Sequence, residues 1–167
     1  MQKFSFSMAV GVLLLIGTLT AVAVYGTDID ATVTPQNISL TVLDTSISYG
    51  SVALSSQKST LQTSDNPDIV NSGNVTENFL IKGYDTTGDG QKWTLDTSTS
   101  TQDHYIDEFS ITGAFPGTAL TTANQTAASS VIVNATSTLD LRISTPEATT
   151  DYNLKNIKVT VTAEASS

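Results

Sequence analysis

The stretch IKVTVTA, residues 157–163, decides the fold class. Its apolar residues alternate with Lys and Thr, and a period of two places every apolar side chain on one face of a β-strand. These apolar residues are Ile157, Val159, Val161 and Ala163. Similar alternation recurs from residue 30 onward in about nine short segments, whereas no window after the first 26 residues has helical spacing. The sequence therefore predicts an all-β fold, specifically an antiparallel two-sheet sandwich of the jelly-roll or Ig-like type.

One segment changes the parity of its alternation. Ile47 and Tyr49 share one face of the predicted strand, whereas Val52 and Leu54 continue on the opposite parity. A one-residue slip turns every following side chain to the other face, so a β-bulge is needed to keep both pairs inside. Gly50 makes such a bulge inexpensive, and a bulged strand is expected here.

Turn residues predict two hairpins. The first turn is NSGN, residues 71–74, and the second contains Gly88 and Gly90. Asn and Gly both accept a positive φ, which tight hairpin turns require. Trp93 follows the second turn and is expected to anchor the core between the sheets. The polar stretch 113–130 predicts one long irregular connection, of the kind that is usually functional or mobile.

Composition excludes several classes of function. Charged residues make up 14% of the 167-residue chain, the net charge is −9, and there is no Cys. Phosphate binding needs clusters of Lys and Arg, so no nucleic-acid partner is expected. The absence of Cys excludes disulfides and thiolate catalysis. The acidity either keeps an extracellular surface soluble or attracts cations.

Residues 1–26 have the pattern of an export signal. Lys3 precedes an uncharged stretch at residues 8–24, and Ala21-Val22-Ala23 fits the small-residue cleavage pattern. We expect a signal peptide over residues 1–26, an extended arm over residues 27–36 and a sandwich domain over residues 37–167. A retained N-terminal anchor is the alternative, and this segment would then be the protein's only membrane contact. The predicted location is secreted, extracellular or on the cell surface.

Four Asn-x-Ser/Thr sequons are candidates for glycosylation in a host that carries out this modification. They begin at Asn37, Asn74, Asn124 and Asn134. Such sequons also arise by chance in a chain rich in Ser and Thr, so they add little to the predicted surface location.

The stretch DTTGDGQKWTLD, residues 85–96, has the outline of a calcium-binding loop. Asp85, Asp89 and Gly90 stand at the first, fifth and sixth positions, where an EF-hand has two ligands and its turn glycine. Thr87 and Trp93 are poor ligands at the third and ninth positions, and the following residues favour a strand where an EF-hand needs a helix. A hairpin turn is the main interpretation; a weak calcium site on Asp85 and Asp89 is the alternative, and no other cofactor is expected.

No catalytic residues are predicted, and the protein is expected not to be an enzyme. The chain lacks a G-x-S-x-G motif and a glycine-rich phosphate loop. His104, the only histidine, would hold a metal together with Asp103 or Glu108. Its parity is opposite to that of Tyr105, so it is expected to point to solvent. Paired carboxylates of the glycosidase type would meet only in three dimensions, and the sequence leaves them open.

Several short stretches carry a family resemblance. They are ISYGSVAL (47–54), IVNSGNVTENFLIKG (69–83), KWTLD (92–96), TLDLRIST (138–145) and IKVTVTA (157–163). Together they resemble prokaryotic secreted β-sandwich surface proteins of the camelysin/TasA type, which form biofilm fibres, and archaeal bundling pilins. The triplet Trp93-Thr94-Leu95 is similar to that of WxL-type surface domains, but the second tryptophan motif of those domains is missing.

The resemblance implies a jelly-roll subunit that forms a homopolymer by donor-strand exchange. In the arm at residues 27–36, Ile29, Ala31 and Val33 alternate with polar residues, and Pro35 would end the pairing. The arm is either the donor strand, the chain's own first strand or a linker. The expected function is a structural subunit of an extracellular filament or biofilm matrix. The alternative is a surface adhesion or carbohydrate-binding module that acts through residues 113–130.

Overall fold

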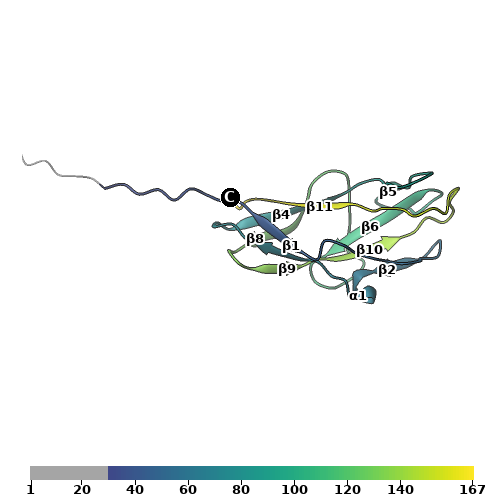
Figure 1. Ribbon diagram of the computed structural model, residues 1–167, viewed down its shortest axis with the longest axis horizontal. Helices are drawn as coiled ribbons and strands as arrows, with labels where there is room; N and C mark the ends of the chain where they lie inside the picture. The colour runs from purple at the N-terminus through teal and green to yellow at the C-terminus, as the bar shows by residue number, and fades with distance from the viewer. Residues whose placement is uncertain (1–29) are drawn as a thin grey trace, which may run out of the picture. The chain divides into compact units, whose positions relative to one another are not determined.

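Eleven strands account for nearly all the regular structure in residues 30–167, the part of the chain that the computed structural model describes (Figure 1). The all-β prediction is confirmed. Among the described residues, the single helix is the one-turn α1 (Thr60–Thr63), and no helix there is long and apolar enough to cross a membrane. The predicted export signal and Ile29 lie outside the described residues. Thr34–Ser167 form one folded unit, which contains all the strands.

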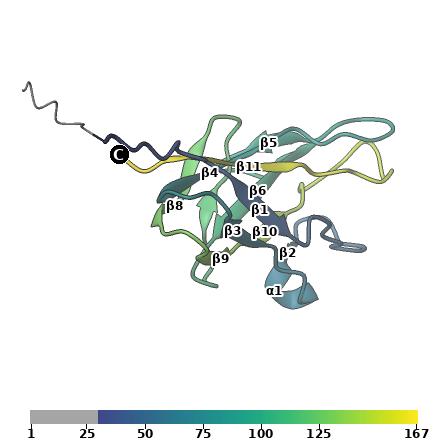
Figure 2. The ribbon, with the colours of Figure 1, turned by 60° about the vertical axis from the view of Figure 1, so that its left-hand side comes forward.

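The strands form three sheets, shown from two directions in Figures 1 and 2. The first, in the order β1-β3-β9, contains β1 (Leu40–Leu43), β3 (Asp68–Asn71) and β9 (Thr136–Thr138). The second, in the order β2-β10-β6-β5, contains β2 (Gln57–Ser59), β10 (Asp140–Ser144), β6 (His104–Ser110) and β5 (Thr94–Asp96), with β7 (Thr118–Ala119) also beside β6. The third, in the order β11-β4-β8, contains β11 (Val159–Ala165), β4 (Glu77–Gly83) and β8 (Gln125–Val131).

Apolar side chains from all three sheets meet in one core, in a sandwich-like arrangement. Phe79 and Ile81 of β4 are fully buried, as are Ile69 of β3 and Leu120 beside β7. Their positions follow from the two-residue period, which sends every second side chain of a strand to the same face. Burial of a large apolar side chain contributes about 1.5–3 kcal/mol, so this core is the main source of stability in a chain without disulfides.

Both predicted hairpins are wrong. Residues 72–76 carry the chain from β3 in the first sheet to β4 in the third, and Asn71 fixes this crossing by donating its side-chain amide to the carbonyls of Val75 and Val131. The loop with Gly88 and Gly90 leads from β4 to β5, which pairs in parallel with β6. Both glycines have a positive φ, as predicted.

The stretch 113–130 is more ordered than its polar composition predicts. It contains β7 and most of β8, and it buries Leu120, Ala127 and Ala128. Two adjacent alanines face the core because the register between β4 and β8 shifts on both sides of Phe79. A bulge of this kind breaks the two-residue period and conceals the strand from pattern analysis.

Candidate functional site

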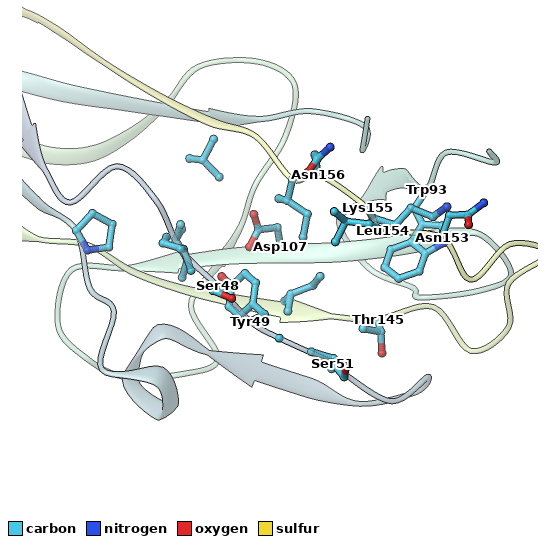
Figure 3. A pocket seen from close by; sticks show the side chains of 18 of the residues that line it. Ser48, Tyr49, Ser51, Trp93, Asp107, Thr145, Asn153, Leu154, Lys155 and Asn156 are labelled. Carbon is cyan, nitrogen blue, oxygen red and sulfur yellow. The ribbon is translucent and has the colours of Figure 1, made fainter. Parts of the chain in front are cut away.

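A groove with a volume of about 910 Å³ opens between two sheet edges (Figure 3). One wall is formed by the end of β1 and the segment that follows it, and the other by β11 and the segment that precedes it. β1 and β11 are the terminal strands of their sheets, so each has one edge without a strand partner. The floor is formed by the second sheet and by the residue that precedes β10. It includes Leu139, Leu141 and Ile143.

The two edges converge at Glu77. The backbone N–H of Ser39, next to β1, donates to Glu77 Oε1 at 2.8 Å, and Ala165 at the end of β11 pairs with Glu77 in the sheet. From this point β1 and β11 run apart, as both ribbon views show (Figures 1 and 2). The groove is therefore the space that opens where two terminal strands separate.

The first wall has the side-chain pattern of a strand without a strand's pairing. Ile47, Tyr49, Val52 and Leu54 are each half-buried between exposed neighbours, and Gly50 has a φ of 62°. The predicted change of parity at Gly50 is confirmed, whereas the predicted bulged strand is wrong because no strand forms between β1 and β2. Residues of this segment point inward as in a sheet, yet the segment has no ladder partner.

The second wall is similarly incomplete. Val159, Val161 and Ala163 of β11 alternate with polar residues but are only half-buried, whereas Phe79 and Ile81 of the adjacent β4 are fully buried. β11 pairs with β4 along its whole length on one side only. Its inward side chains therefore lack the cover that another strand on the groove side would supply.

A polar pair lies in the middle of the groove (Figure 3). Asp107 of β6 is 1% exposed, and its Oδ1 has no hydrogen-bond partner among the described residues. The hydroxyl of Tyr49 is also buried without a described partner. Burial raises the pKa of Asp107 to about 8; the backbone N–H of Glu108 lowers it by hydrogen bonding, and the charge of Glu108 raises it. Burial likewise raises the pKa of Tyr49, and the nearby carboxyl of Asp107 adds to the rise.

Trp93 lies at the wide end of the groove and not in the core between sheets, where it was predicted. Its indole N–H donates to Thr149 at 3.1 Å, and the ammonium of Lys155 lies 6.0 Å from its ring centre. Tyr152 and Leu154, on the same loop as Lys155, are 82% and 79% exposed. This loop has no periodic pattern in the sequence, so sequence analysis missed its contribution to the groove.

The described part of the arm has no regular secondary structure. Residues 30–38 are exposed and form no strand, and Val33 is 89% exposed. Asn74 holds the chain just after Val33 by donating to the carbonyl of Pro35 and accepting from the N–H of Asn37. Of the three predicted donor residues, Ala31 and Val33 are therefore exposed, and Ile29 lies outside the described residues.

The two predicted calcium ligands have different surroundings. The carboxylate of Asp85 accepts the backbone N–H of Leu95 at 2.9 Å, whereas Asp89 is exposed at the loop tip. Within residues 30–167, no three His, Asp or Glu side chains are grouped closely enough to hold a metal. The calcium site stays a prediction, and residues 30–167 offer it two carboxylates at most.

A thermal melt with calcium and with EDTA tests this site. If Asp85 and Asp89 bind the ion, millimolar calcium raises Tm, EDTA reverses the rise, and Asp89→Asn removes it, because ligand binding to the folded state alone raises stability. An identical Tm of the unaltered chain with calcium and with EDTA would exclude calcium binding at this loop. Asp68→Asn, an acidic position outside this loop, is the control for loss of charge.

The other predicted residues lie apart from the groove. His104 is 40% exposed at its side chain, and its Nδ1 lies 3.4 Å from Asp96 Oδ2, so the imidazole is only partly turned to solvent. The sequon asparagines Asn37, Asn74, Asn124 and Asn134 are all exposed. Asn74 uses its side-chain amide to hold the arm, so glycosylation there would compete with that contact.

Comparison of the chain with protein-family models, curated proteins and solved structures gave no match. The class is therefore defined by the fold and the site alone. It is an all-β domain with an open, largely apolar groove between two strand edges, preceded by exposed residues 30–38 that form no strand.

Proposed function

We propose that this protein is a secreted structural subunit of an extracellular filament or surface matrix, and that it polymerises by strand donation. The observation that carries the proposal is the groove between the free edges of β1 and β11. Unpaired strand edges accept an extended segment from a neighbour, which gains main-chain hydrogen bonds along its length. The donor is the arm at residues 27–36 of a second copy.

The inserted arm would complete one layer of a sandwich. The first and third sheets would join through the arm in the order β9-β3-β1-arm-β11-β4-β8 and would cover the second sheet. The product is a two-sheet, mostly antiparallel sandwich of jelly-roll or Ig-like type with no opening between β1 and β11. β1 and β11 run in opposite directions from Glu77, so the arm would be antiparallel to one of them and parallel to the other. Every inward residue of the two walls would then have a neighbour on the groove side.

Burial of apolar side chains supplies the driving force. Ile29 and Val33 would each contribute about 1.5–3 kcal/mol when they leave water for a floor of Leu139, Leu141 and Ile143. Ala31, between them, would lie over the larger side chain of Tyr49. Backbone pairing with two edges adds hydrogen bonds of about 1 kcal/mol each.

The tether at Asn74 favours exchange between copies over self-insertion. It holds the backbone on both sides of Gln36, at Pro35 and at Asn37. For the arm to turn back into its own groove, the chain would have to reverse direction within these few residues and lose both hydrogen bonds. A head-to-tail contact between copies avoids that reversal and generates an open filament.

A carbohydrate- or partner-binding module on the cell surface is the second candidate. The observation that favours it is the wide end of the groove, where Trp93 lies near the amide of Asn153 (Figure 3). Aromatic rings beside hydrogen-bonding groups suit sugar surfaces. The ammonium of Lys155 already lies over the ring of Trp93, which leaves less of this ring available to a sugar.

Electron microscopy with a competing peptide tests the proposed function. The chain beginning at Thr27 is expected to form fibres, and an excess of acetylated peptide 27–36 should shorten or prevent them by filling the groove. A peptide of the same composition in scrambled order is the control. Trp93 is the only Trp and lines the groove, so its fluorescence should respond to the specific peptide alone. Monomers at high concentration that bind a sugar and ignore the peptide would favour the second candidate.

A further inference from the structure

Asp107 is an unusual residue for the floor of an apolar groove. It lies in the middle of β6 on the inner face, between the buried aromatic residues Tyr105 and Phe109. An ionised carboxylate at such a position is strongly unfavourable unless a cation or several hydrogen bonds compensate for it. Its Oδ1 has no such partner among the described residues.

The charged and titratable groups around Asp107 do not compensate for a negative charge. Tyr49 comes from the first wall, and Tyr105 precedes Asp107 on β6, with its hydroxyl donated to the carbonyl of Tyr84. Two further carboxylates lie near these tyrosines and raise their pKa values: Asp65 near Tyr49 and Asp85 near Tyr105.

The basic side chains nearby already have partners. Lys155 of the second wall is bonded to Asp151, and Lys58 donates to the carbonyl of Tyr49. Arg142 of β10 forms an ion pair with Glu108, which follows Asp107 on β6. The neutral form of Asp107 is therefore favoured even while the groove is open.

We propose that insertion of the arm is linked to proton binding at Asp107, so that strand donation proceeds with a neutral carboxyl and is reversed by alkaline pH. This inference rests on the proposed function. Inward-facing Ile29, Ala31 and Val33 bring no hydrogen-bond donor to Asp107 Oδ1. They also fill the open groove beside this carboxyl with hydrocarbon, and this change makes the ionised form still less favourable.

The direction of the pH dependence follows from linkage. Burial gives Asp107 a pKa of about 8 in the open groove. Further desolvation by the arm raises this pKa, so the assembled state binds the proton more tightly than the free subunit. The Asp107 contribution to assembly is complete below pH 8 and is lost as the pH rises from 8 through the higher pKa of the filled groove.

The critical concentration for polymerisation measures this linkage. Sedimentation of the chain beginning at Thr27 should give a constant value between about pH 6 and 7.5, and a rise of up to about tenfold per pH unit above pH 8. Asp107→Asn, a neutral residue of the same shape, should polymerise with no rise in this range. Glu164→Gln removes a charge from the exposed face of β11 and should keep the pH profile of the unaltered chain.

Each outcome decides between the two proposals. Filaments whose critical concentration is independent of pH in the unaltered chain overturn the proton linkage and leave strand donation standing. A rise that persists in Asp107→Asn assigns the proton to another group and also overturns it. An absence of filaments at every pH, for the unaltered chain and both variants, overturns the proposed function and the linkage together. Circular dichroism at each pH establishes that the domain stays folded.

Discussion

Replacing Ile29 and Val33 by Asp should abolish the proposed polymerisation while leaving the domain folded. In the proposed filament both side chains enter the groove above Leu139, Leu141 and Ile143. A carboxylate without a partner is several kcal/mol less favourable in such a setting, so two of them should raise the critical concentration by more than about 1,000-fold. Val33 is 89% exposed in the free subunit, and its substitution should not change the thermal melt of the monomer.

The arm also provides a matched control. Thr32 lies between Ala31 and Val33 with the opposite parity and would face outward from the completed layer. Thr32→Asp adds the same kind of charge within the same ten residues, and it should change the critical concentration less than about tenfold. Equal losses in Thr32→Asp and in the double variant would mean that the arm does not insert in this register.

Phe79→Ala should lower the free energy of unfolding of the monomer by about 3–5 kcal/mol. Phe79 is fully buried in β4, the central strand of the third sheet, and the substitution leaves a cavity that its neighbours cannot fill. Urea denaturation followed by the fluorescence of Trp93 measures the change. Leu61 of α1 is 45% exposed, so Leu61→Ala should lower the free energy of unfolding by less than about 1 kcal/mol. A decrease in the free energy of unfolding below about 1 kcal/mol for Phe79→Ala would mean that Phe79 does not pack in the core.

The two-residue period predicted which side chains face inward. It was right for β11, for β1 and, across the change of parity at Gly50, for residues 47–54. The inward direction is a local property of an extended chain, so the sequence alone reveals it. Residues 47–54 also show its limit, because their inward side chains do not belong to a paired strand.

The partner of each strand could not be predicted in the same way. NSGN at residues 71–74 has the composition of a hairpin turn, but Asn71 bonds to Val75 and Val131 and directs the chain into another sheet. Val131 lies 60 residues away along the chain, and no local pattern contains that contact. Hydrogen bonds between distant segments decided the pairing.

Part of the groove was visible in the sequence, and part was not. In the sequence, Asp107 is a carboxylate on the same predicted strand face as Tyr105 and Phe109. Its isolation from any described partner became apparent only when the surrounding sheets were assembled. The groove itself is a consequence of two terminal strands that separate, which is a property of topology and has no sequence signature.

In the proposed filament, the free edge of β11 pairs with the arm of a second copy. The chain contains no Cys, so introduced thiols report on one pair of positions at a time. Thr162 is exposed on the outer face of β11, and Thr32 would lie on the same face of the inserted arm. Side chains on neighbouring strands lie about 5 Å apart, within reach of a short bismaleimide.

Cross-linking of the double variant Thr32→Cys, Thr162→Cys is the most direct measurement. Strand donation should give a ladder of covalent multimers on a denaturing gel, because each copy gives one arm and receives another. The pair Thr32→Cys, Ser129→Cys places the second thiol on β8, at the opposite edge of the third sheet, and should give no ladder. A ladder through Ser129, a link within single chains, or no link through Thr162 in assembled material would contradict the claim.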